Sequence, residues 1–241
     1  MTDKTMFITV EGIDGSGKST VVEALAERYN AVTTCEPSKH WTGPVVRKAL
    51  SDDETAPLTD FFLFMADRCH HIENTIRPAL EAGETVISDR YADSTLAYQS
   101  HALREQFKAP ERYMESLMEP WNLEPDLTLY INISVDTALE RCDQGDKYEN
   151  REFIQAAKDN YDRLVRPKNR VVTIDGEQPP EKVVEDCLRV VSIFESGTVC
   201  EVRDYVQSRH HQNPKDSEVG ERELSSDRMS PKDSEVKEHV R

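Results

Sequence analysis

The sequence has few cysteines, no long apolar run and no excess of basic residues, and each absence excludes a class of protein. Its 5 cysteines are irregularly spaced and form no C-x-x-C pair, which predicts reduced thiols in a cytoplasmic protein. No stretch approaches the roughly 18 apolar residues of a membrane span, and the chain starts directly with a strand-like run. We therefore expect neither a membrane helix nor a secretory signal. Because a polyanion repels a chain with a net charge of -16, we also expect no nucleic-acid partner.

The acidic excess belongs to residues 1–206, which we expect to form the folded domain. Residues 207–241 contain only 5 apolar residues and repeat Pro-Lys-Asp-Ser-Glu-Val at 214–219 and 231–236, so we predict a disordered charged tail there. The tail holds 8 acidic and 7 basic residues, against 38 acidic and 23 basic residues in the domain. With 12 lysines to 18 arginines, this composition is typical of the surface of a salt-adapted, halophilic protein.

Strand-like and helix-like segments alternate along the expected domain. Strands are predicted at 6–10, 31–34, 85–88, 127–133 and 171–174. Helices are predicted at 18–29, 44–50, 57–82, 92–100, 110–119, 135–141, 149–165 and 180–194. This alternation predicts an α/β fold with a five-stranded parallel sheet and helices on both faces. Ligands of such folds bind at the carboxyl ends of the strands.

The helix predicted at 57–82 has two faces of interest. An apolar stripe at steps of three and four indicates packing on the core, and it consists of Leu58, Phe62, Met65, Cys69, Ile72, Ile76 and Leu80. A face about 100° away carries Phe64 and Arg68, which are neighbours because they are four residues apart. A ring and a guanidinium so placed can stack on a flat base and donate hydrogen bonds to its carbonyl oxygens. A core phenylalanine beside a surface arginine is the alternative interpretation.

A glycine-rich loop follows the first strand and leads into the first helix. Its sequence fits G-x-x-x-x-G-K-S, in the strand–loop–helix context that a phosphate-binding P-loop requires. Glycines let the backbone N–H groups face a phosphate, the lysine reaches the β- and γ-phosphates, and the serine hydroxyl binds Mg²⁺. The residues expected to bind nucleotide here are Gly12, Ile13, Asp14, Gly15, Ser16, Gly17, Lys18, Ser19 and Thr20.

Two common classes of P-loop protein do not fit the rest of the sequence. No N-K-x-D guanine motif occurs, which excludes a GTPase switch, and the strand after the long helix ends in Asp89-Arg90 instead of Asp-Glu. An arginine after the acidic residue suits an acceptor phosphate, which it can bind bidentately, better than a water nucleophile. Ser94, Tyr98 and Gln99 follow within two turns. The charged loop 141–151 could act as a lid that excludes water, and a solvated surface loop is the alternative interpretation.

Together these segments resemble the thymidylate kinase family of P-loop nucleoside-monophosphate kinases over about residues 5–195. The matching segments, in the order of the family, are 7–19, 36–37, 63–68, 89–94, 97–99, 125–130 and 146–149. The resemblance implies that the protein is an enzyme that transfers the γ-phosphoryl group of ATP to dTMP, with Mg²⁺, in dTTP synthesis. It also implies a homodimer. Another nucleoside or nucleoside-monophosphate kinase, or a nucleotide-binding module without turnover, remains as an alternative.

The resemblance also implies roles for individual residues. Asp14 would hold the 3′-hydroxyl of dTMP, while Phe64 stacks on thymine and Arg68 donates to its O4. Arg90 would bind the acceptor phosphate, and Tyr98 would disfavour a 2′-hydroxyl. The further residues implied are Ser94 and Gln99 for the acceptor, Arg141 for the adenine, Lys18, Asp89, Arg90 and Lys147 for catalysis, and Ser19 and Asp89 for the metal.

This sequence departs from the family pattern at two places. Many members have an arginine where Cys35 stands, and either Lys39 or Arg47 could replace its contact with the acceptor phosphate. The P-loop offers no basic residue at positions 15 and 16, so the lid must supply the second cation. Lys147 is the expected one, although a lysine is a poorer bidentate clamp than the arginine often found there.

Overall fold

The computed structural model describes residues 4–141, 150–165, 167–197 and 202. The predicted tail and the lid residues 142–149, Lys147 among them, therefore lie outside the described residues. Every element below belongs to the unit Met1–Asp204.

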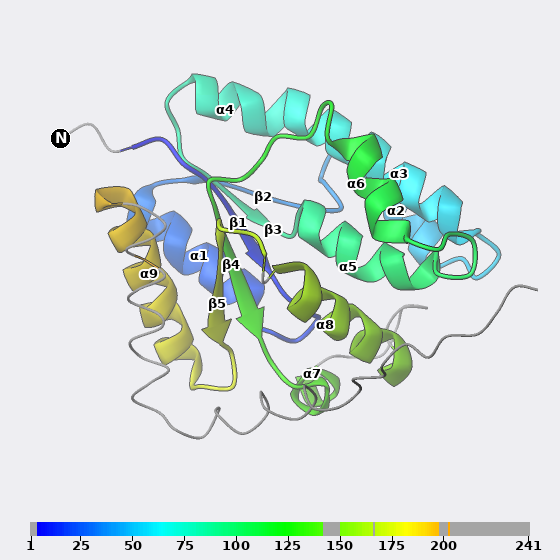
Figure 1. Cartoon of the computed structure of the whole chain (residues 1–241). Coiled ribbons are helices and arrows are strands. Elements are labelled where there is room, and N and C mark those ends of the chain that lie inside the picture. The colour runs from blue at the N-terminus through cyan, green and yellow to red at the C-terminus, as the bar shows by residue number, and fades with distance from the viewer. Residues whose placement is uncertain (1–3, 142–149, 166, 198–201, 203–241) are drawn as a thin grey trace, which may run out of the picture. The chain divides into compact units, whose positions relative to one another are not determined.

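Among the described residues, five parallel strands form one sheet in the order β2-β3-β1-β4-β5 (Figure 1). The strands are β1 (Phe7–Glu11), β2 (Val32–Cys35), β3 (Val86–Asp89), β4 (Leu127–Asn132) and β5 (Val171–Asp175). In the register of β1 with β3, Val10 lies opposite Asp89. The segments that follow these two strands therefore leave the sheet side by side, as the predicted fold requires.

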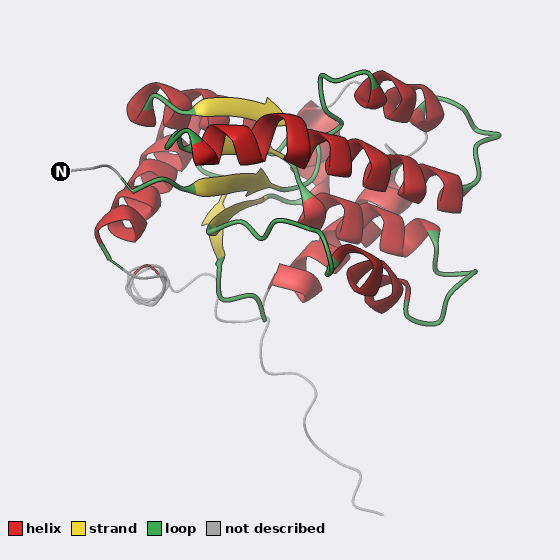
Figure 2. Ribbon diagram, turned by 90° about the horizontal axis from the view of Figure 1, so that it is seen from above, coloured by secondary structure: helices red, strands yellow, loops and turns green. Residues whose placement is uncertain are grey.

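Helices cover both faces of the sheet (Figures 1 and 2). They are α1 (Lys18–Tyr29), α2 (Thr42–Leu50), α3 (Pro57–His71), η1 (Ile72–Ile76), α4 (Arg77–Glu81), α5 (Ala92–Ala102), α6 (Pro110–Met118), α7 (Val135–Arg141), α8 (Arg151–Val165) and α9 (Pro180–Ser196). α1 and α9 pack against each other on one face, and α3, α5, α6 and α8 lie on the other. The predicted fold class is confirmed.

Two apolar clusters fill the space beneath the second group of helices. One joins Phe7 of β1 and Val86 of β3 to Met65 of α3, and the other joins Tyr130 of β4 to Tyr161 of α8. α5 contributes to both clusters, and it packs on α3, α6 and α8. It is therefore held on several sides, which makes it a firm support for the polar side chains at its start.

The long helix differs from its prediction in two ways. The segment expected at 57–82 contains a π-helical turn, η1, between α3 and α4. The turn precedes Pro78, which has no N–H to donate and whose ring would collide with the carbonyl four residues earlier, so the wider turn accommodates it.

The predicted apolar stripe was wrong at Phe62 and Cys69, which are exposed. The buried face of α3 instead includes Phe61, Asp67 and Arg68. A hydropathy pattern treats charged residues as exposed, so it placed the stripe to one side of a face that buries two hydrogen-bonded charges.

Candidate active site

The loop between β1 and α1 has the backbone conformation of a phosphate cradle. Gly12, Gly15 and Gly17 have φ values of 148°, 77° and 87°, which non-glycine residues rarely adopt. A Cβ at residue 12 would also lie 2.6 Å from the backbone oxygen of Ile131. The glycines let the loop close tightly over β4 and end at the positive N-terminus of α1, which suits an anion.

Lys18 places its ammonium group inside this loop. Nζ donates to the backbone oxygen of Ile13 at 2.9 Å, and the side chain is buried. Burial lowers the pKa of Lys18 to about 8, and the nearby Arg90 adds to the lowering. A phosphate bound in the cradle would stabilise the charged form of Lys18, because the phosphate would replace the water that the buried ammonium group lacks.

Ser19 and Asp89 bring two oxygen ligands together from different elements. Oγ of Ser19, in the first turn of α1, donates to Oδ2 of Asp89, at the end of β3, at 2.9 Å. A hydroxyl beside a carboxylate fits Mg²⁺, which takes oxygen ligands and is usually held by few side chains together with substrate phosphates. No group of three or more His, Cys, Asp or Glu side chains among the described residues could hold a metal alone.

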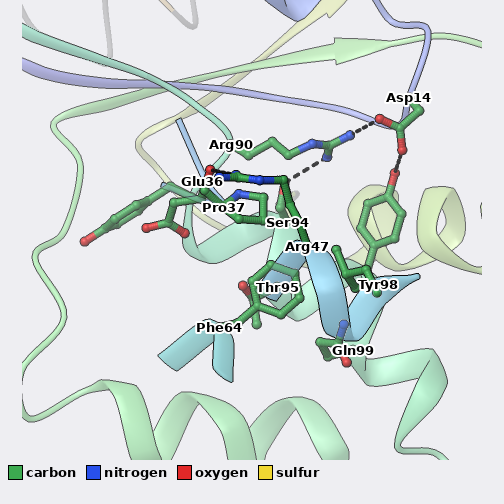
Figure 3. Close-up of a pocket in the computed structure, with 12 residues that line it drawn as sticks. Asp14, Glu36, Pro37, Arg47, Phe64, Arg90, Ser94, Thr95, Tyr98 and Gln99 are labelled. Carbon is green, nitrogen blue, oxygen red and sulfur yellow. Dashed lines mark hydrogen bonds and ion pairs between the residues drawn. The ribbon is translucent and has the colours of Figure 1, made fainter. Parts of the chain in front are cut away.

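Arg90 links the phosphate loop to the start of α5 (Figure 3). Its Nη2 lies 2.5 Å from Oδ1 of Asp14, and its Nη1 donates to the Gly12 oxygen at 3.0 Å and to Ser94 Oγ at 3.1 Å. The residue has a φ of 69°, a strained conformation for a non-glycine residue. The surrounding contacts hold this strain, and they aim the guanidinium at the space between the two elements.

Asp14 and Tyr98 complete this cluster. The Tyr98 hydroxyl donates to Oδ2 of Asp14 at 3.1 Å, and the Tyr98 ring lies beneath the guanidinium of Arg90 at 5.3 Å. The positive charge of Arg90, followed by that of Lys18, lowers the pKa of Asp14 to about 2 despite its partial burial. Asp14 is therefore an anion in the working range of pH, and it can accept a hydrogen bond from a hydroxyl of a ligand.

A cavity of about 280 Å³ opens beside this cluster (Figure 3). Its lining residues are Asp14, Glu36, Pro37, Arg47, Leu50, Phe64, Arg90, Tyr91, Ser94, Thr95, Tyr98 and Gln99. The structure thus brings together all but one of the residues predicted for the acceptor, from the P-loop, α2, α3 and α5. An aromatic ring, two arginines and several hydroxyl and amide groups around one cavity suit a phosphorylated, planar ligand.

Arg68 is the exception, because it does not line the cavity. Its side chain is fully buried and donates to the Glu36 carboxylate from both Nε, at 3.0 Å, and Nη2, at 2.5 Å. Nη2 also donates to Oγ1 of Thr95 at 2.7 Å. Since Glu36 and Thr95 both line the cavity, the guanidinium lies directly behind its wall. Its reading of a base stays a prediction.

The structure separates the two candidates for the second phosphate contact. Arg47, on α2, lines the cavity and donates to the backbone oxygens of Pro37 at 2.9 Å and Ser38 at 3.0 Å. Lys39 is exposed and does not line it. Arg47 is therefore the better placed of the two.

Arg141 lies at the other side of the phosphate loop. The residue ends α7, and its Nη1 lies 3.3 Å from the backbone oxygen of Gly15 in the P-loop. This position suits a contact with the nucleotide that the P-loop would bind. The predicted catalytic lysine of the lid lies outside the described residues, so its role also stays a prediction.

Sequence reasoning missed three polar residues that shape the site. Glu11, at the end of β1, is buried and accepts hydrogen bonds from the Tyr91 N–H at 2.8 Å and the Tyr161 hydroxyl at 2.9 Å. Burial, followed by the nearby Asp93, raises the pKa of Glu11. Glu36 and Thr95 hold Arg68 from the cavity wall. The signal for Glu11 was available, since a charged residue ended an otherwise apolar strand.

The fold is a parallel α/β sheet with a P-loop, and Ser19 and Asp89 offer two oxygen ligands for a metal ion. Arg90 joins the P-loop to a separate cavity. These features define the protein as a P-loop kinase. No described helix is both long and apolar enough to cross a membrane. Comparison with known proteins then narrows the class. A family model for thymidylate kinase matches residues 10–187.

Individual relatives agree with the family model. A "Probable thymidylate kinase" from Natronomonas pharaonis is 40% identical over 190 residues, which cover 77% of this chain and 97% of that protein. Proteins with the same name from Halobacterium salinarum and Methanococcoides burtonii are each 39% identical, and they match 75% and 80% of this chain. The matches cover 92% and 100% of those two proteins. The chain belongs to the thymidylate kinase family, so the predicted family and kinase class are confirmed.

Proposed function

We propose that this protein transfers the γ-phosphoryl group of ATP to dTMP, giving dTDP and ADP. The observation that supports this most directly is the position of Arg90, which bonds to Gly12 and Asp14 of the P-loop and to Ser94 of the acceptor cavity. A phosphate donor in the loop and a phosphate acceptor in the cavity would meet at this side chain. The family membership supplies the identity of the two nucleotides.

The donor side holds the phosphates of ATP. Lys18 and the loop N–H groups bind the β- and γ-phosphates, and Arg141 lies on the side expected for the adenine. Ser19 and Asp89 hold Mg²⁺, which neutralises phosphate charge when it is bound with ATP. Transfer is in line and needs no covalent enzyme intermediate, because catalysis rests on positioning and charge neutralisation.

The acceptor side orients dTMP toward the donor. Arg90 and Arg47 bind its phosphate, and Asp14 accepts a hydrogen bond from the 3′-hydroxyl. Tyr98, held against Asp14 by its hydroxyl, occupies the space next to the sugar and disfavours a 2′-hydroxyl. Phe64 stacks on the thymine ring, with Ser94 and Gln99 completing the contacts.

A substrate panel tests this function. We expect ADP release with dTMP at the highest kcat/KM, and measurable release with dUMP, because one methyl group is worth only about 1–3 kcal/mol of discrimination. UMP should be poor because of its 2′-hydroxyl, and AMP and CMP should be near background. Comparable rates with AMP or CMP and none with dTMP would favour another nucleoside-monophosphate kinase. Nucleotide binding with no turnover of any acceptor would favour a binding module.

The assembly proposed is a homodimer that uses the exposed apolar surface of α2 and α3. Trp41, just before α2, is 73% exposed, Val45 of α2 is 42% exposed and Phe62 of α3 is 47% exposed, and the two helices pack together. Light scattering during size exclusion should give a mass twice that of one chain. Phe62→Asp should shift the measured mass toward that of a single chain. A monomer at micromolar concentration would contradict the proposal.

The remaining proposals concern the surroundings of the enzyme. The acidic excess and the haloarchaeal relatives support a protein adapted to high salt, and the reduced cysteines support a cytoplasmic location. Residues 1–206 form the catalytic domain, and the tail 207–241 is not needed for turnover. Lys147, in the lid, supplies the cation that the P-loop lacks.

A further inference from the structure

A buried chain of hydrogen bonds runs from His71 to the wall of the acceptor cavity. His71, the last residue of α3, is fully buried, and its Nδ1 lies 3.1 Å from Oε1 of Glu36. Its Nε2 lies 2.5 Å from Oγ1 of Thr34 in β2. Because Glu36 lines the cavity, the chain connects the sheet to the surface that the acceptor contacts.

The direction of each hydrogen bond follows from the chemistry of the groups. A carboxylate only accepts, so Nδ1 of His71 carries the proton and donates to Glu36. In the neutral ring Nε2 then accepts from the hydroxyl of Thr34, so both ring nitrogens have a suitable partner. This assignment rests on the pattern of partners around the ring.

Glu36 in turn fixes the guanidinium of Arg68. Nε and Nη2 of Arg68 donate to the carboxylate, and Nη2 also donates to Oγ1 of Thr95. Among the residues that the structure describes, Nη1 donates only to the Sδ of Met118, a weak acceptor, at 3.2 Å. The plane of the guanidinium is thus set by the plane of the carboxylate, and Nη1 is the end least well satisfied.

The Glu36 carboxylate needs a second hydrogen-bond partner, because the carboxylate and the guanidinium of Arg68 could otherwise rotate together as one pair. Oε1 is the atom that this partner binds, since it faces both Arg68 Nε at 3.2 Å and His71 Nδ1. His71 is in turn held by β2, which is part of the sheet. The side chains of Arg68 and His71 are both 0% exposed, so solvent does not compete for their contacts with Glu36.

We propose that His71 is a positioning residue for recognition of the acceptor base. It orients Glu36, Glu36 orients Arg68, and the guanidinium so placed favours a pyrimidine with an oxygen at position 4 over one with an amino group. A 4-amino group presents donors to a donor, whereas a 4-oxo group accepts. This inference rests on the proposed function and on the role that the family resemblance implies for Arg68, which is to donate to the base from its place behind the cavity wall.

Two substitutions of His71 separate positioning from simple packing. In His71→Asn the amide nitrogen falls near the place of Nδ1, so the donor to Glu36 is kept. In His71→Gln it falls near Nε2, so the link to Thr34 is kept and the donor to Glu36 is lost. Both replacements are polar amides. His70→Gln is the control, because the neighbouring histidine contacts Asn74 on the outer side of the helix and takes no part in the chain.

The readouts are kcat/KM for dTMP and for dCMP, and KM for ATP. We expect His71→Gln to lower kcat/KM for dTMP by about tenfold or more, since small misplacements of a positioned group have large effects. The ratio of dTMP to dCMP should fall with it, while KM for ATP stays within about twofold. His71→Asn should retain most of the preference, and His70→Gln should match the unmodified enzyme.

The proposal is overturned if His71→Gln and His71→Asn have the same ratio of dTMP to dCMP as the unmodified enzyme. It is also overturned if both lower the ratio equally, or if they change only the melting temperature. If either variant does not fold, Thr34→Val tests the same chain from its far end. It should lower the ratio in the same direction but by less than His71→Gln, because the donor to Glu36 is kept, and an unchanged ratio would overturn the proposal. Absence of dTMP turnover in the unmodified enzyme would refute the proposed function instead.

Discussion

Single side chains in this site act mainly through charges that have lost their water. Lys18 is buried in the P-loop, Arg90 is held in a strained conformation against Asp14 and Ser94, and Arg68 is fully buried on Glu36. Each cation is positioned before any nucleotide binds. Such preorganised charge is the usual source of catalysis in phosphoryl transfer, because the protein does little covalent chemistry.

Replacing the P-loop lysine should remove turnover. Lys18→Ala deletes the cation at the centre of the phosphate cradle, and we expect kcat to fall by about 10²–10³-fold or more. ADP release with saturating dTMP measures it. Lys48→Ala, an exposed lysine on α2, is the matched control and should keep full activity. A Lys18→Ala enzyme with unchanged kcat would overturn the assignment of the P-loop.

At the scale of elements, two close packings position the acceptor cavity. The start of α2 lies against the segment that follows β2, so a Cβ at Gly43 would come within 1.8 Å of the Ser38 backbone oxygen. The start of α5 is tied to the entry of β5, since Asp93 accepts hydrogen bonds from Lys168 at 2.6 Å and Arg170 at 2.8 Å. Both elements carry residues that line the cavity.

Gly43→Ala should displace α2 from the cavity wall. We expect a loss of about 1–3 kcal/mol in the free energy of unfolding and a raised KM for dTMP, because Arg47 moves with the helix. Urea unfolding and steady-state kinetics measure the two effects. Gly83→Ala is the control: its φ of 82° costs about 1 kcal/mol, but no atom lies near its Cβ position. Its KM for dTMP should not change, and a change in both variants would mean that KM follows stability alone.

Asp93→Asn should lower stability at neutral pH by about 3 kcal/mol, because it removes the buried anion that Lys168 and Arg170 share. Arg170 and Lys168 hold the pKa of Asp93 below its usual range even though burial acts to raise it. The ion pairs therefore stabilise the fold above the ordinary carboxyl pKa of about 4 and lose this effect as the pH falls through the lower folded value.

Urea unfolding at several pH values checks this dependence. The difference in unfolding free energy between the unmodified protein and Asp93→Asn should be largest near pH 7 and shrink below about pH 4. A difference that stays constant down to pH 3 would show that the ion pairs of Asp93 are not responsible.

At the scale of the whole chain, the protein carries a net charge of -16, yet its site must bind two polyanions. The cations that do this, Lys18, Arg47, Arg90 and Arg141, come from four different parts of the sequence and meet at the carboxyl edge of the sheet. The rest of the surface repels itself at low ionic strength. Salt should therefore stabilise the protein without abolishing its site, because Lys18, which is buried, and Arg90, which is half-buried, are screened less than the exposed acids.

The melting temperature should rise with KCl, with most of the electrostatic gain below about 1 M, where the screening length has already fallen to about 3 Å. Differential scanning calorimetry from low to multimolar KCl measures it. NaCl at the same ionic strength should give a similar gain, because screening does not depend on the identity of the cation. A melting temperature that is flat or falls with both salts would contradict a salt-adapted surface.

The sequence by itself determined the sheet, the P-loop and most of the cavity residues. Strand and helix periodicity is local, and parallel strands bring their carboxyl ends to one edge, so the residues after β1 and β3 had to meet. Periodicity could not place contacts between residues that are distant in sequence. Only the tertiary structure decided that Arg47 and not Lys39 faces the cavity, and that Pro78 is accommodated by a π-helical turn. It also decided that Glu36 and His71 hold Arg68 behind the wall, because a charge can be buried only where the packed fold supplies its hydrogen-bond partners.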